Sequence, residues 1–144
     1  MKNTISRSTL QALGLILLFL PGLVSCKKDK NDEPALRDQI VGEWEITSFT
    51  VDGLELMDFA LNSSVLEFGT ADGSKGDYQW SFNYIDGTST NTDGDYEVDE
   101  DSEEVIFDGK TQSEMRYDLD LDGDELEMSG IVDGSRYELK LQRD

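Results

Sequence analysis

The chain has 144 residues, enough for one domain, and its 32 acidic and 12 basic residues give a formal net charge of −20 at pH 7. Such an acidic surface repels phosphate backbones, so we expect no nucleic-acid partner, and the charge most simply keeps the protein in solution. Histidine is absent and Cys26 is the single cysteine. This composition excludes a Ser-His-Asp triad, a His-ligated zinc site, and a disulfide or thiol nucleophile in the folded part, so we expect a non-enzymatic protein without a cofactor.

Residues 1–25 have the composition of an export signal peptide. Lys2 and Arg7 give this segment a positive start, and an apolar stretch over residues 10–20 follows. The stretch is shorter than the roughly 20 residues that a transmembrane helix needs. A removable signal is therefore the better interpretation.

The end of this segment carries a second motif, Leu23-Val-Ser-Cys26. It resembles the lipobox of bacterial lipoproteins, and the resemblance implies cleavage before Cys26 and lipidation of its thiol, which palmitate labelling would detect. Two or more acyl chains hold a protein on a membrane almost permanently, so we expect the membrane as a partner through the lipid anchor. Because no Asp follows Cys26 directly, the resemblance favours the outer membrane of the cell envelope, with the domain periplasmic or surface-exposed. The charged composition of residues 26–39 predicts a flexible tether.

From residue 40 onward, short alternating runs are separated by turn residues, which is typical of antiparallel strands. Asp-Gly pairs favour tight hairpins, and here they begin at Asp52, Asp72, Asp86, Asp93, Asp108, Asp122 and Asp133. The strands predicted between them cover residues 42–51, 64–68, 77–85, 95–100, 103–107, 113–121, 125–132 and 135–142. Residues 54–61 are expected to form a short helix or a lid.

Alternation within each strand assigns an inward face, since neighbouring side chains point to opposite sides. The inward sets are Trp44, Ile46 and Ser48; Tyr78, Trp80, Phe82 and Tyr84; Met115, Tyr117, Leu119 and Leu121; Leu126, Met128, Gly130 and Val132; and Tyr137, Leu139 and Leu141. The small residues Ser48 and Gly130 are expected to leave interior volume unfilled. Eight hairpin-linked strands, each with one apolar face, predict an all-β, antiparallel up-and-down barrel, with a β-sandwich as the alternative.

Two runs of acidic residues stand out in the sequence, and the first resembles a metal site. Asp118-Leu-Asp-Leu-Asp-Gly-Asp124 resembles the start of a calcium loop, but its twelfth position, where such a loop needs a bidentate Glu, is Ser129. We therefore interpret these aspartates as the solvent face of a strand and expect no metal site. The run Asp99–Glu104 is interpreted as a solvated hairpin tip.

The segment from Ile40 to Asp144 resembles the lipocalin-like proteins that bacteria attach to their membranes. The resemblance rests on Val41-Gly-Glu-Trp44, on the turn Val51-Asp-Gly53 and on the closing run Tyr137-Glu-Leu-Lys-Leu-Gln-Arg143. It implies a lipocalin-like barrel over residues 40–144, with Gly42 and Trp44 at its closed end and Arg143 packed over the indole. Antiparallel pairing of the first and last strands would bring Trp44 and Arg143 together in a cation–π contact.

Three functions remain open. The first is a membrane-anchored lipocalin-like protein that binds a small apolar or amphipathic ligand or acts as an accessory subunit of an envelope protein. An eight-stranded barrel is either filled by side chains or just wide enough for one small ligand; residues expected to line such a cavity are Tyr78, Trp80, Phe82, Tyr84, Tyr117 and Met128. The alternative is a glycan- or protein-interaction module with a filled barrel and aromatics outside. A saccharide hydrolase that works through two carboxylates ranks third, because nothing in the sequence selects one pair.

Overall fold

The structure is a computed structural model that describes residues 34–143. The export signal, Cys26 and the charged run after it lie outside the described residues. Within the described range one helix precedes nine strands. These elements are α1 (Leu36–Ile40), β1 (Gly42–Val51), β2 (Leu54–Glu55), β3 (Leu61–Phe68), β4 (Lys75–Tyr84), β5 (Ser89–Asp99), β6 (Glu104–Phe107), β7 (Met115–Asp122), β8 (Glu125–Val132) and β9 (Ser135–Arg143).

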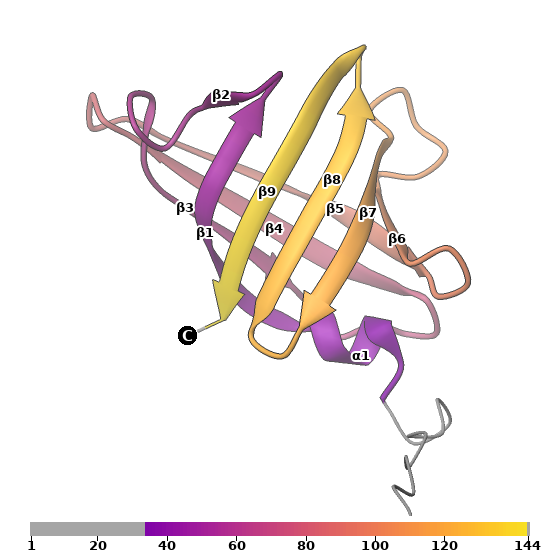
Figure 1. Cartoon of the computed structure of the whole chain (residues 1–144). Helices are drawn as coiled ribbons and strands as arrows, with labels where there is room; N and C mark the ends of the chain where they lie inside the picture. The colour runs from indigo at the N-terminus through magenta and orange to yellow at the C-terminus, as the bar shows by residue number, and fades with distance from the viewer. Residues whose placement is uncertain (1–33, 144) are drawn as a thin grey trace, which may run out of the picture. The chain divides into compact units, whose positions relative to one another are not determined.

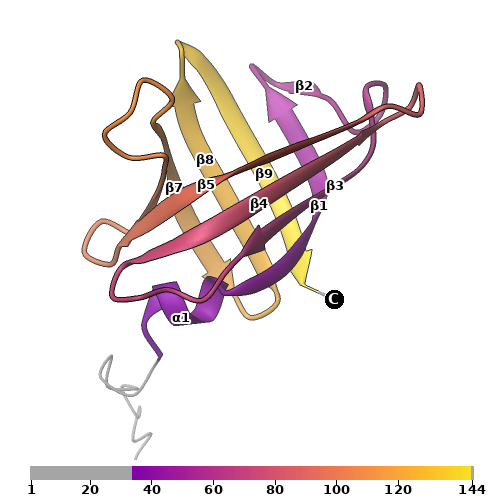
Figure 2. The same cartoon turned by 180° about the vertical axis from the view of Figure 1, so that it is seen from behind.

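The strands form one closed antiparallel barrel (Figures 1 and 2). Their order is β2-β1-β3-β4-β5-β6-β7-β8-β9, and β1 also pairs with β9. The two-residue β2 pairs with β1 alone, so the other eight strands build the wall. The predicted up-and-down barrel is therefore confirmed in place of the β-sandwich. No helix within residues 34–143 is long and apolar enough to cross a membrane.

The sequence did not predict α1, whose residues 36–39 lie in the segment assigned to the tether. Figure 2 shows the helix across one end of the barrel, which we call the closed end. Its last residue, Ile40, is completely buried. The opposite end, where β2 and the β8–β9 hairpin lie, is called the open end.

Most Asp-Gly pairs lie in turns, as expected. At Asp133-Gly134, for example, φ is 52° and 86°, and positive φ at both positions is what a type I′ hairpin turn requires. The expectation is wrong at Asp93-Gly94, which lies inside the eleven-residue strand β5. Gly94 serves close packing instead, because a Cβ there would lie 2.1 Å from Oδ1 of Asp108.

A β-bulge in β1 changes which side chains point inward. The register between β1 and β9 shifts between Ile46 and Ser48, and beyond this shift Phe49 is buried while Ser48 is only partly so. The inward assignment of Ser48 is therefore wrong, because one extra residue reverses the alternation that follows it. Gly130 leaves no free volume either, since a Cβ there would lie 2.2 Å from the carbonyl oxygen of Arg116.

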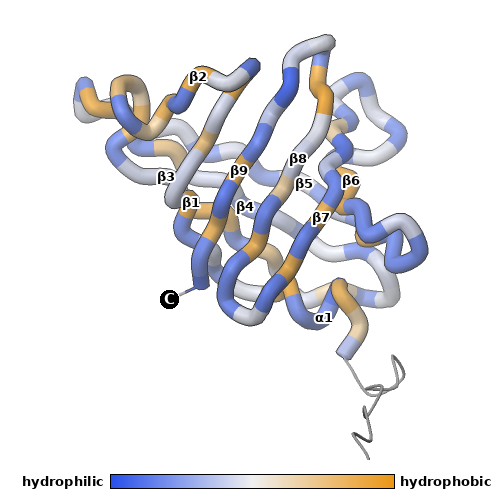
Figure 3. The backbone as a smooth tube through the Cα atoms, in the orientation of Figure 1, coloured by the Kyte–Doolittle hydropathy of each residue, from blue (hydrophilic) through white to orange (hydrophobic). Residues whose placement is uncertain are grey.

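The core is continuous through the barrel and is built from inward residues of every wall strand. Figure 3 shows the alternation of polar and apolar residues along β8 and β9 that separates this interior from the solvent face. At the closed end, Ile40 of α1 and Trp44 and Phe68 near the ends of their strands are all 0 % exposed. The closed end is thus sealed by packing.

Candidate functional site

Trp44 and Arg143 fasten the closed end. They are direct partners in the β1–β9 ladder, and Cζ of Arg143 lies 4.4 Å from the centroid of the Trp44 ring. The indole N–H donates to the carbonyl of Ile40 at 2.7 Å, and the Arg143 guanidinium donates to the carbonyls of Gln39 and Val41. Carbonyls at the end of a helix lack partners within it, so these contacts hold α1 in place. Gly42, where β1 begins, has a φ of 125°, which favours glycine.

The other end of α1 is also held by a side chain. The amides of Leu36 and Arg37 donate to the Glu100 carboxylate at 2.8 and 3.0 Å. Glu100 belongs to the acidic hairpin tip between β5 and β6, so this run does more than face solvent. The contacts at the closed end therefore all serve to hold α1 against the barrel.

The open end has a different character, because its rim is apolar. Among residues 34–143, the exposed large hydrophobic side chains are Leu54, Phe59, Ile85 and Ile131, with exposures from 49 % to 72 %. All four lie in or beside the β1–β3, β4–β5 and β8–β9 connections, which meet at this end (Figure 1). We call them the apolar rim.

Exposure of inward side chains rises toward this rim. Along β4, Trp80 is buried, whereas Phe82 and Tyr84 are partly exposed. The same change occurs along β9 between Leu139 and Tyr137. Solvent therefore reaches the inward side chains that lie nearest the rim.

Aromatic rings from three strands line the interior below the rim. The rings of Trp80 and Phe82 stack with centroids 5.0 Å apart, and Phe49 lies 6.0 Å from Trp80 and 6.1 Å from Tyr137. The Trp80 indole N–H donates to the buried hydroxyl of Ser64 at 3.0 Å, which fixes the orientation of its ring. We call Phe49, Trp80, Phe82 and Tyr137 the aromatic lining.

Residues 54–60 form a lid beside this lining. The segment contains β2 and a turn, so the expected short helix is absent, and Leu56, Met57 and Ala60 pack against the core. The Glu55 carboxylate accepts hydrogen bonds from the Ser48 hydroxyl and from the amides of Phe49 (2.9 Å) and Met57 (3.0 Å). Burial alone would raise the pKa of Glu55, but these hydrogen bonds outweigh it and hold the pKa below its ordinary value. Glu55 therefore latches the lid to β1.

The barrel wall is incomplete on one side of the open end. The four-residue strand β6 pairs with β5 only from Tyr96 onward, and β7 pairs with only the first part of β8. The loop of residues 108–114 spans this gap. Its first residue, Asp108, accepts a hydrogen bond from the Tyr78 hydroxyl at 3.1 Å. The Asp108 carboxylate therefore lies between the wall gap and the barrel interior.

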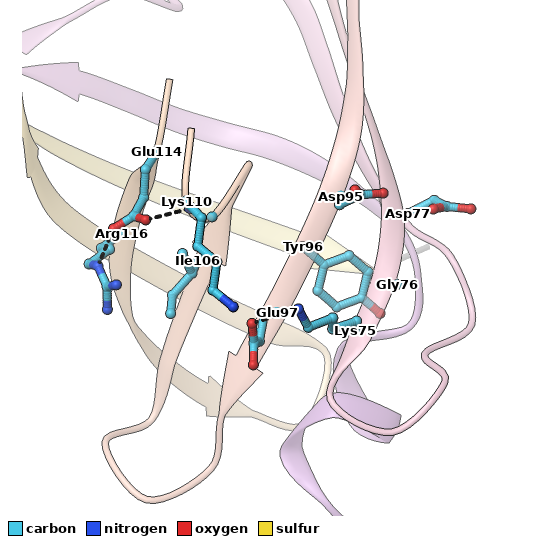
Figure 4. A pocket seen from close by; sticks show the side chains of 11 residues that line it. Lys75, Gly76, Asp77, Asp95, Tyr96, Glu97, Ile106, Lys110, Glu114 and Arg116 are labelled. Atoms are coloured by element: carbon cyan, nitrogen blue, oxygen red, sulfur yellow. Dashed lines mark hydrogen bonds and ion pairs between the residues drawn. The ribbon is translucent and has the colours of Figure 1, made fainter. Parts of the chain in front are cut away.

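A separate groove of about 290 Å³ lies on the outer face of β4 to β7 (Figure 4). Two ion pairs form among its charged side chains: Lys75 with Glu97 at 3.3 Å, and Arg116 with Glu114 at 2.7 Å. Exposed ion pairs of this kind contribute little. The groove is distinct from the open end, because these side chains point away from the barrel interior.

The sequence-derived cavity residues all belong to the interior face. Phe82 and Tyr84 lie nearest the rim, and Trp80 and Tyr78 lie deeper along β4. Tyr117 and Met128 come from β7 and β8 and are almost completely buried. Sequence reasoning missed Phe49, which the bulge turns inward, as well as Phe107 and Asp108 around the wall gap.

The aspartates of the calcium-like run lie on the outer face of β7 and in the turn after it. Asp118 and Asp120 are exposed. Within residues 34–143 no group of three or more His, Cys, Asp or Glu residues is placed to hold a metal ion.

Comparison with known proteins agrees with this architecture. The chain is similar to a redesigned β-barrel (TM-score 0.57, 17 % identity, covering 76 % of this chain and 96 % of the other). It is also similar to a de novo designed fluorescence-activating β-barrel (TM-score 0.52, 15 % identity, 78 % and 100 % covered). A lipocalin whose expression the myc oncogene activates has a TM-score of 0.49 at 13 % identity, with 78 % and 74 % covered. A search of curated proteins found no significant match. The model of the lipocalin-like domain family matches residues 40–128, so the chain belongs to that family.

Proposed function

We propose that this protein binds a small apolar or amphipathic molecule in the open end of its barrel. The observation that carries the proposal is the convergence of the apolar rim and the partly exposed aromatic lining at one end. Removing apolar surface from water contributes about 25 cal/mol per Å². A ligand that covered these side chains would therefore gain binding free energy from the apolar surface that it buries. Concave, mostly apolar sites with a few polar groups are the usual form of small-molecule sites.

The orientation of the aromatic side chains favours this proposal over a glycan-binding module. A sugar-stacking platform would need aromatic rings on the outer face of the wall. The row from Tyr78 to Tyr84 instead faces the interior, and Phe59, in the lid, is the strongly exposed aromatic among the described residues.

The binding test uses the two tryptophans, because Trp80 belongs to the aromatic lining, whereas Trp44 contacts α1 and Arg143. In a Trp44→Phe variant, Trp80 in the aromatic lining is the remaining tryptophan. Titration with the neutral apolar probe N-phenyl-1-naphthylamine is expected to quench Trp80 emission in a saturable, one-to-one manner. The matched Trp80→Phe variant keeps only Trp44 at the closed end and should show much weaker quenching. Absence of saturable binding, or equal quenching of both tryptophans, would contradict the proposal.

We further propose that the protein is a lipoprotein held on the outer membrane through Cys26, with the domain periplasmic or surface-exposed. The lipobox-like run Leu23-Val-Ser-Cys26 supports this. A Cys26→Ser variant should accumulate as uncleaved precursor that takes up no labelled palmitate and does not fractionate with the outer membrane. Continued labelling of the variant would rule the anchor out.

A further inference from the structure

The first part of β5 is an unpaired strand edge within the barrel wall. On one side, β5 pairs with β4 from Ser89 to Glu97 without a register shift. On the other side, its pairing with β6 covers only Tyr96 to Asp99. Residues 89–93 are all exposed, and within residues 34–143 no strand lies beside them on the side of the wall gap. We call residues 89–93 the free edge.

Backbone hydrogen-bonding groups of the free edge point into the gap. In an antiparallel strand, the N–H and C=O of one residue point to the same side, and this side alternates along the chain. The carbonyl of Thr88 bonds to β4 at 2.9 Å, whereas that of Asp95 bonds to the start of the loop before β7 at 2.8 Å. Odd-numbered residues of β5 therefore face the gap. Within residues 34–143, no backbone hydrogen bond is formed on this side by Ser89, Asn91 and Asp93.

The interior face of the free edge is uncovered as well. Thr90 and Thr92 are the ladder partners of Phe82 and Trp80 on β4. Because paired residues of neighbouring strands point to the same side of a sheet, both threonines face the interior. They are nevertheless exposed, whereas Tyr96, an inward residue of the same strand that also has β6 beside it, is 1 % exposed. A further strand at this position would cover the two threonines.

The free edge lacks most of the features that keep strand edges from pairing with other chains. Such edges are commonly protected by Pro, Lys or a β-bulge. Residues 89–93 read Ser-Thr-Asn-Thr-Asp, without Pro or Lys, and their register with β4 is regular. Threonine also favours the extended conformation of a strand. An edge of this kind is suited to the addition of an extended chain segment.

The charge around the free edge determines which segment it attracts. Residues 86–95 contain three aspartates and neither Lys nor Arg. Asp93 and Asp95 are exposed on the outer face of β5, and so is Asp77, the partner of Asp95 on β4. A second copy of the chain carries the same acidic edge and a net charge of −20, which opposes self-pairing. A cationic segment is attracted instead.

We propose that the free edge binds an extended, cationic segment of a partner protein by antiparallel strand addition. Basic side chains of that segment lie on the outer face beside Asp93, and the alternate, apolar side chains cover Thr90 and Thr92. The backbone groups that bond to the segment are those of Ser89, Asn91 and Asp93. This interaction surface is additional to the proposed small-molecule site, and its test needs no small-molecule ligand.

Titration of the full-length chain with a capped heptapeptide that alternates Lys and Val, beginning with Lys, tests the backbone pairing. In antiparallel addition, the peptide residues whose side chains point outward, here Lys, also direct their amides toward the free edge. N-methylation of the Lys amides should therefore weaken binding about tenfold, whereas N-methylation of the Val amides should change it less than about twofold. The two peptides carry equal charge. Equal binding of both would reveal attraction to the acidic surface alone and overturn the proposal.

Asn91→Pro tests the same pairing from the side of the protein. It removes an amide that points into the gap and no hydrogen bond to β4. The unmodified peptide should bind about tenfold more weakly to Asn91→Pro. Asn91→Ala is the matched control, because it keeps the amide and should bind as the wild type does. Urea midpoints of both variants report whether they are folded. Equal affinity of the two folded variants contradicts strand addition.

Hydrogen exchange on the wild type gives a result that does not depend on any variant. Peptide binding should increase the protection of the Ser89, Asn91 and Asp93 amides and leave those of Thr90 and Thr92, which point toward β4, nearly unchanged. An equal gain at all five amides, or no gain, overturns the proposal. A dimer in analytical ultracentrifugation that Asn91→Pro abolishes also overturns it, because the free edge then pairs with a second copy.

Discussion

Trp44 stabilises the closed end in three ways. Its side chain is completely buried, its ring packs against the Arg143 guanidinium, and its N–H donates a hydrogen bond to the last residue of α1. Removing a buried Trp typically costs about 3 to 5 kcal/mol, whereas a partly desolvated cation–π contact contributes about 0.5 to 2 kcal/mol. Trp44→Ala should therefore unfold or nearly unfold the domain. Arg143→Ala should lower the free energy of unfolding in urea measurably and leave the domain folded.

Arg136→Ala provides the control for these two variants, because Arg136 is exposed on β9. Its effect should stay within about 0.5 kcal/mol, the usual range for a surface substitution. If Trp44→Ala unfolds within about 1 kcal/mol of the wild type, Trp44 does not seal the barrel.

Gly130 allows the backbone of β7 to approach β8 closely. A Cβ on Gly130 would lie 2.2 Å from the carbonyl oxygen of Arg116 and 3.1 Å from the Tyr117 ring. Because the nearest atom belongs to the backbone, Gly130→Ala should destabilise the domain by about 1 to 3 kcal/mol, as overpacking does. Gly109→Ala, whose Cβ would meet Cγ2 of Ile106 at 3.4 Å, should change the urea midpoint far less. Equal midpoints for the two variants would disprove close packing at Gly130.

The lid is the element whose attachment depends on pH. The folded-state pKa of Glu55 is lowered, so its contribution is present above the unfolded-state pKa of about 4.3 and is lost as pH falls through the folded-state value. Hydrogen-exchange protection of the Phe49 and Met57 amides should therefore drop between neutral pH and pH about 3, while the other strand amides stay protected. Glu55→Gln should show low protection at both pH values. A protection profile in Glu55→Gln that follows the wild type would show that Glu55 is not the latch.

The elements that the sequence predicted are those that local patterns determine. Alternation and Asp-Gly turns placed β1 and β8 at their observed bounds. The elements it missed depend on distant contacts: α1 is held by Glu100 and Arg143, and Gly94 belongs to a strand because Asp108 folds over it. The same limit applies to the site. The β-bulge in β1 places Phe49 instead of Ser48 on the inward face, which alternation alone could not predict. No local pattern predicts the hydrogen bond between Asp108 and Tyr78.

At the scale of the whole molecule, the net charge of −20 opposes compaction. Salt screens this repulsion, so the melting temperature should rise between low ionic strength and about 0.15 M sodium chloride. Differential scanning calorimetry measures the change. A melting temperature that falls or stays constant would mean that attractive pairs, such as Lys140 with Glu127, outweigh the repulsion.

A comparison of calcium with magnesium distinguishes general charge screening from a specific calcium site. Because the carboxylates of Asp118 and Asp120 are spread along the outer face of β7, millimolar calcium should raise the melting temperature no more than magnesium does. A stoichiometric calcium isotherm with micromolar affinity would show that these residues form a true site.

The described chain enters the barrel through Pro34 and α1 and leaves it at Arg143, and both positions are at the closed end (Figure 1). A group joined directly before Pro34 or after Arg143 would therefore lie at the end of the barrel opposite the apolar rim. The same attachment inserted at the Asp133-Gly134 turn would stand beside the rim and block it. Chain topology alone thus keeps both ends of the described chain away from the apolar rim.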